Sequence, residues 1–162
     1  MTALTWTNSL ALDHPQMDAT HEEFVALLAA TDAALTGPKP ELLRCFEALC
    51  DHTIEHFAQE ERWMEATGFA ADNCHAGQHQ QVLGIMLECA QRAADPQAPD
   101  FEPLEAAVGE LASWFPRHAQ MMDAGLAEHL VAVGFDEATG QCREAVAADG
   151  EALTHCASAH CG

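Results

Sequence analysis

The chain has no tyrosine and only six lysine and arginine residues among its 162 positions, against 26 aspartate and glutamate residues. Its formal net charge is therefore −20 at pH 7 with histidine neutral. Because a surface of this sign repels phosphates and anionic headgroups, we expect neither nucleic acid nor a membrane surface as a partner. The same charge attracts cations, although acidity of this kind most often serves solubility.

Long apolar runs are also missing. No stretch approaches the roughly 18 apolar residues in a row that a membrane-spanning helix needs. The N-terminus lacks the basic region and apolar run of a signal peptide, and the seven cysteines include no Cys-x-x-Cys pair. We therefore expect a reduced, cytoplasmic chain, either a monomer or a weak oligomer.

The residue types that are abundant favour helices. Alanine, leucine, glutamate and glutamine dominate, β-branched residues are few, and proline and glycine separate four segments with apolar residues at helical spacing. We predict helices over residues 18–35, 41–67, 71 to about 94, and 103–133, with Gly68 ending the second. Since the connections are short, the predicted fold is all-α, an up-down-up-down antiparallel four-helix bundle with a C-terminal extension.

The extension differs in composition from the bundle. We expect the bundle to occupy residues 1–134 and the extension to occupy residues 135–162, where alanine, glycine and small polar residues prevail. Residues 141–153 are expected to form a short amphipathic helix, followed by a loose tail. The tail contains Cys156, His160 and Cys161, which could bind a soft metal or form a disulfide, but we favour a loose end.

Histidine is unusually abundant, with ten residues. His56 and Glu60 are one helical turn apart, and His75 and His79 have the same spacing, so each pair shares a helix face. The antiparallel arrangement brings polar groups of all four predicted helices to one level of the bundle. These candidate metal ligands are His21, His56, Glu60, His75, His79, His118 and Asp123.

Five imidazoles and two carboxylates exceed the four or so ligands that one zinc ion takes. They suit two metal ions bridged by the carboxylates. Mixed imidazole and carboxylate ligands favour iron, with manganese or zinc as alternatives, over copper in a thiolate site. Seven protein ligands and a bridging oxygen leave one metal with an open position, at which a small molecule could bind.

Four sequence pieces resemble the hemerythrin family in order and spacing. They are MDATHEEF (17–24), HFAQEE (56–61), HAGQH (75–79) and WFPRHAQMMD (114–123), and the resemblance covers about residues 5–133. It implies two iron ions, one held by His75, His79 and His118 and the other by His21 and His56, with Glu60 and Asp123 bridging. It also implies that dioxygen is the ligand, bound at the iron with two histidines, and that Trp114 and Phe115 line an apolar oxygen pocket.

The segment 114–123 has two features that are unusual in a regular helix, the position of Asp123 and the presence of Pro116. Asp123 lies five residues after His118, about 140° around an ideal helix, so a local bulge or a long reach must bring it to the same face. Pro116 removes a helical hydrogen bond just before His118 and is expected to kink the helix.

Reversible dioxygen binding for storage, delivery or sensing is the leading hypothesis, which makes the chain a binding protein and not an enzyme. The alternatives are a di-iron scavenger of peroxide or nitric oxide, a weak oxidase, or an iron-handling or regulatory module with a protein partner. Among the histidines outside the set, His52 is a rival ligand, whereas His14 and His129 are expected on the surface.

Overall fold

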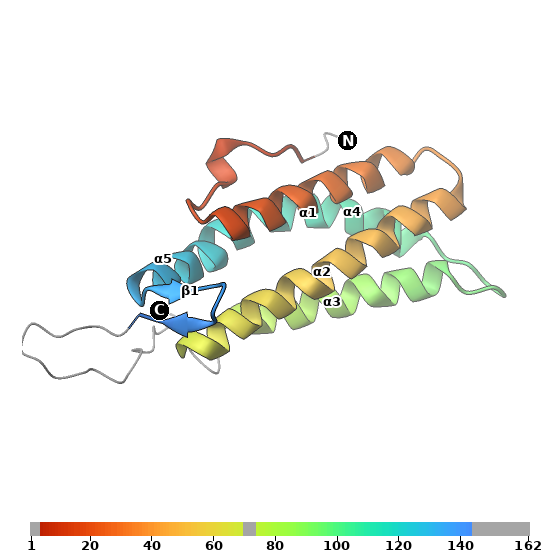
Figure 1. The fold of residues 1–162 in the computed structure, drawn as a ribbon. Helices are drawn as coiled ribbons and strands as arrows, with labels where there is room; N and C mark the ends of the chain where they lie inside the picture. The colour runs from red at the N-terminus through yellow and green to blue at the C-terminus, as the bar shows by residue number, and fades with distance from the viewer. Residues whose placement is uncertain (1–3, 70–73, 144–162) are drawn as a thin grey trace, which may run out of the picture.

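A computed structural model of the chain describes residues 4–69 and 74–143. Four long helices form its body (Figure 1): α1 (Pro15–Ala34), α2 (Lys39–Thr67), α3 (Cys74–Ala93) and α4 (Glu102–His118). The fourth helix continues through a π-helical turn, η2 (Ala119–Asp123), into α5 (Ala124–Ala132). A 3-10 turn, η1 (Asn8–Leu10), precedes α1, and the strands β1 (Phe135–Asp136) and β2 (Gln141–Cys142) follow α5.

The helices close a four-sided bundle. α1 packs against α2 and α4, and α3 packs against the same two helices. The predicted all-α bundle is confirmed, and α1 and α2 each begin a few residues earlier than expected because a proline supports the first turn of each. In the described part of the chain, no helix combines the length and apolar character needed to span a bilayer.

Two apolar clusters fill the bundle at different levels. The large cluster includes Phe24, Phe46, Leu104 and Phe115, all at most 1% exposed. The small cluster lies nearer α5 and consists of Met17, Trp63, Met64, Leu126, Ala127 and Leu130. Burial of each large side chain contributes roughly 1.5–3 kcal/mol. The buried residue of α1 between these clusters is His21, and that of the η2–α5 run is Asp123, so a polar layer separates the clusters.

His14, predicted to be a surface residue, is buried. It is the N-cap of α1, where its Nδ1 accepts a hydrogen bond from the Met17 N–H at 3.3 Å, and its Nε2 lies 2.6 Å from Glu137. Because the Nδ1 lone pair accepts, the proton of the neutral ring lies on Nε2 and points at Glu137. The surface prediction for His14 is wrong because its partner Glu137 is distant in the sequence.

The two strands were not predicted. β1 and β2 pair antiparallel, with Phe135 opposite Cys142 and Asp136 opposite Gln141. Gly140, with a φ of 69°, supplies the left-handed conformation that closes the turn between them. The helix expected over residues 141–153 is therefore wrong at its start, and the rest of that segment and the tail with Cys156, His160 and Cys161 lie outside the described residues.

The end of α2 at Gly68 gives a test of the fold. Gly68 has a φ of 66°, and its N–H bonds to the carbonyls of Met64 and Glu65. Gly68→Ala is expected to lower the free energy of unfolding by about 1 kcal/mol, since a Cβ is strained in this conformation. Gly84→Ala is the matched control, because it lies within α3 with open space around the added Cβ, and it should raise that free energy by roughly 0.5–1 kcal/mol. Thermal or urea unfolding that moves both variants in the same direction would contradict this interpretation.

Candidate metal centre

α1 and α2 supply three of the clustered groups. His21 on α1 and His56 and Glu60 on α2 are all buried. The four-residue spacing on α2 puts His56 Nε2 2.9 Å from Glu60 Oε1. Across the two helices, His21 Nε2 lies 3.6 Å from that same oxygen.

α3 supplies His75 and His79, whose side chains share the inner face of the helix. His75 Nε2 lies 3.1 Å from Glu60 Oε2 and 2.9 Å from Asp123 Oδ1. His79 Nε2 lies 3.3 Å from Glu60 Oε2 and 3.1 Å from the Nε2 of His118.

The π-helical turn η2 solves the spacing problem between His118 and Asp123. A π turn closes its hydrogen bonds over five residues where an α turn uses four, so a residue five positions later returns to nearly the same face. His118 Nε2 accordingly lies 3.1 Å from Asp123 Oδ1, and Asp123 Oδ2 lies 3.1 Å from His21 Nε2. Of the two predicted alternatives, a local bulge or a long reach, the structure contains the bulge. The predicted kink at Pro116 stays a prediction, since α4 runs through this residue to His118.

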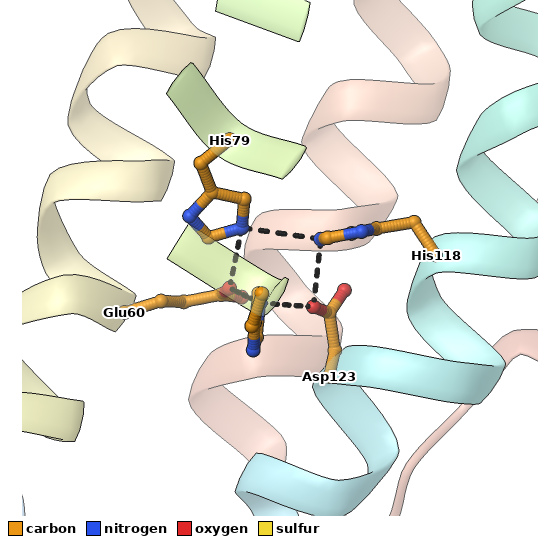
Figure 2. A group of neighbouring side chains, drawn as sticks. Glu60, His79, His118 and Asp123 are labelled. Atoms are coloured by element: carbon orange, nitrogen blue, oxygen red, sulfur yellow. Dashed lines mark hydrogen bonds and ion pairs between the residues drawn. The ribbon is translucent and has the colours of Figure 1, made fainter. Parts of the chain in front are cut away.

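All seven predicted residues thus lie in one buried cluster, and they divide into two overlapping groups. The three-histidine group consists of Glu60, His75, His79, His118 and Asp123. The two-histidine group consists of His21, His56, Glu60 and Asp123. Within each group, the possible ligand atoms lie within 4.8 Å of one another. Figure 2 shows Glu60, His79, His118 and Asp123 pointing toward a common centre from α2, α3, the end of α4 and η2. The two carboxylates belong to both groups, as bridging groups would.

The orientation of these atoms fits cations better than internal hydrogen bonds. Both oxygens of Asp123 and the Nε2 of His21 are buried without a hydrogen-bond partner in the described residues, despite contacts near 3 Å. The Nε2 atoms of His79 and His118 point at each other. Two nitrogen lone pairs that face each other repel, so the rings can both present lone pairs here only if a cation lies between or beside them. Buried polar atoms without partners are costly, and a set of convergent imidazoles and carboxylates is the donor set of a metal site.

Without metal, the cluster balances its own charge. Burial lowers the pKa of His21 and of His75, but contacts with Asp123 and Glu60 outweigh it and raise each pKa to about 9. Burial disfavours ionised Glu60 and Asp123 too, yet the surrounding imidazoles hold the pKa of each carboxyl well below its usual range. At neutral pH, two imidazolium groups therefore offset two carboxylates, and metal ions would replace those two protons.

Aromatic rings enclose the cluster. Phe57 stacks on His79 with ring centroids 3.8 Å apart and planes 2° apart, and Trp114 stacks on His118 at 4.4 Å. Phe115 meets His21 edge to face at 5.2 Å and stacks on Phe24. Trp114 and Phe115, predicted to line one oxygen pocket, therefore lie beside different histidines, and only Phe115 lies beside the two-histidine group.

Two further histidines of the described residues link segments of the chain. His52 lies outside both groups, and its Nε2 donates to the Thr20 carbonyl at 3.1 Å. His129, expected on the surface, is half-buried and donates to the Thr67 carbonyl at 3.2 Å. Sequence reasoning also missed Gln78, whose Oε1 lies 2.9 Å from His118 Nδ1. Its place three residues after His75, on nearly the same helix face, was the available signal.

Comparison with known proteins agrees with this geometry. Residues 13–130 match the family described as "Hemerythrin HHE cation binding domain". A protein named "Bacteriohemerythrin" from Ralstonia nicotianae is 34% identical over 136 residues, which is 84% of this chain and 95% of that protein. Another "Bacteriohemerythrin", from Methylococcus capsulatus, is 27% identical over 92 residues, 57% of this chain and 68% of its own length.

The raised pKa values predict a pH effect in the metal-free protein. A histidine whose pKa rises from 6.5 to about 9 on folding adds stability that is complete below pH 6.5 and is lost as the pH rises through 9. The free energy of unfolding of metal-free protein should therefore fall by at least about 1 kcal/mol between pH 6.5 and 9. Metal-loaded protein, whose histidines would already be deprotonated, should show no such fall. Urea unfolding at a series of pH values measures both, and parallel curves would contradict the charge balance described here.

Proposed function

Because the chain belongs to the hemerythrin family, we propose that it binds dioxygen reversibly at a non-haem di-iron centre. The observation that carries this proposal is the pair of overlapping residue groups that share Glu60 and Asp123 in the bundle interior. In this proposal, His75, His79 and His118 hold one iron, His21 and His56 hold the other, and the two carboxylates bridge them. The pair of irons would supply the electrons that dioxygen binding requires.

The unequal number of histidines supports a proposal for where the small molecule binds. The three-histidine group offers five protein ligands with the shared carboxylates, whereas the two-histidine group offers four. The open position is therefore proposed on the side of His21 and His56. Phe24 and Phe115 lie beside these two histidines and give this side an apolar wall.

The surroundings favour binding over turnover. The histidines of the cluster are buried and several are covered by aromatic rings, which limits the access of water and protons. Protons promote the irreversible oxidation of a bound-dioxygen centre, so a dry apolar wall favours release of the ligand unchanged. We propose oxygen storage, delivery or sensing as the role, without an enzymatic step.

The dioxygen proposal predicts a reversible optical change. Iron-loaded protein, reduced without oxygen, should take up about one dioxygen per chain, develop visible absorption, and lose that absorption when oxygen is removed under inert gas. Oxygen uptake and spectra over several cycles provide the measurement. Irreversible loss of the visible absorption, with release of hydrogen peroxide in the first cycle, would contradict reversible dioxygen binding and support an oxidase.

The ligand assignment predicts a loss of iron on substitution of one histidine. His79→Ala removes an imidazole from the three-histidine group, so bound iron should fall from two to about one per chain or lower. His52→Gln is the control, because His52 lies one turn away on α2 and outside both groups, and the glutamine amide can still donate a hydrogen bond to the Thr20 carbonyl. Iron analysis and near-ultraviolet spectra distinguish the variants. Full iron content in the first variant, or a loss in the second, would show that the assignment is wrong.

A further inference from the structure

His118 differs from the other histidines of the cluster in the surroundings of its Nδ1 atom. Nδ1 of His118 lies 2.9 Å from Gln78 Oε1, whereas the Nδ1 atoms of His21, His56, His75 and His79 are buried without a hydrogen-bond partner among the residues that the structure describes. Because Nε2 of His118 faces the cluster, a neutral ring that binds metal there carries its proton on Nδ1. That N–H donates to the amide oxygen of Gln78.

Gln78 joins the two helices that supply the three-histidine group. It lies on α3 directly before His79, and its side chain reaches His118 at the end of α4. The backbone around His118 has weak local support, because Pro116 has no N–H to donate and the π turn begins one residue after His118. The ring of Trp114 supports one face of His118, while Gln78 fixes the position of its Nδ1 edge.

This edge of the site borders the surface. A cleft of about 380 Å³ between α3 and α4 is lined by His118 together with Gln78, Gln81, Trp114, Arg117, Met121 and Met122. The amide of Gln78 therefore takes the place that water could occupy at the Nδ1 edge. Gln81 lines the same cleft, but no hydrogen bond joins it to His118 in the described residues.

We propose that Gln78 is a positioning residue that fixes the tautomer and orientation of His118, and that its neutral amide tunes the metal held by that histidine. The second part of this inference rests on the proposed di-iron function. An amide accepts the Nδ1 hydrogen bond without withdrawing the proton, whereas a carboxylate draws the proton toward itself and makes the imidazole a stronger electron donor. The amide therefore keeps the metal easier to reduce than a carboxylate would.

The positioning role is tested with Gln78→Leu, which has a similar size but no acceptor. Its affinity for metal at the three-histidine group should fall about 10- to 100-fold, the usual effect of removing a partner that orients a ligand. Gln81→Leu is the matched control and should bind as the unmodified chain does. Competition with a chelator, using Zn²⁺ as the probe, measures the affinity without any dioxygen chemistry. Unchanged affinity in Gln78→Leu, or an equal loss in both variants, would overturn the positioning role.

The tuning role is tested with Gln78→Glu, which restores an acceptor at the same place. This variant should retain both irons, show a lower reduction potential and oxidise faster in air than the unmodified protein. Spectroelectrochemistry of the iron-loaded protein gives the potential, and a potential that is equal to or higher than that of the unmodified chain would overturn the tuning role. If the unmodified chain holds two irons but binds no dioxygen, the proposed function fails while both Gln78 tests stand.

Discussion

The structure depends on the burial of five imidazoles and two carboxylates at one level of a helical bundle. Removing each ionised group from water costs several kcal/mol, so such a layer persists only if its charges are balanced. The metal-free chain achieves that balance with protons on His21 and His75 opposite Glu60 and Asp123. The apolar clusters on either side supply stability that the polar layer does not. Metal ions are the natural replacement for those protons, which links folding, pH and metal binding in one site.

The rest of the fold holds the layer in place. The π turn brings Asp123 onto the face of His118, and contacts between segments brace the helices around the cluster. His52 ties α2 to the turn of α1 that carries His21, and Gln78 ties α3 to α4. The pair of His14 and Glu137 joins the start of α1 to the hairpin (Figure 1), whose strands follow α5. Each of these contacts is a single hydrogen bond or ion pair, at a position where a small rotation of the helix would move a ligand residue.

Local patterns were sufficient to predict the helices and to select the clustered residues other than Asp123. The four-residue spacings of His56 with Glu60 and of His75 with His79 are properties of one helix, and antiparallel packing sets their common level. The resemblance to the hemerythrin family supplied Asp123, which spacing alone would have rejected. The burial of His14 and the contact between Gln78 and His118 depend on partners 40 or more residues away. No periodicity reports such contacts, which is why they were missed.

The central claim is that two iron ions lie in this layer and share Glu60 and Asp123. Anomalous X-ray diffraction at the iron absorption edge, from crystals of the iron-loaded chain, tests it most directly. Our account predicts two iron peaks within the cluster, both in contact with the two carboxylates, one beside His75, His79 and His118 and the other beside His21 and His56. A single peak, or peaks that leave Glu60 or Asp123 without iron, would contradict it.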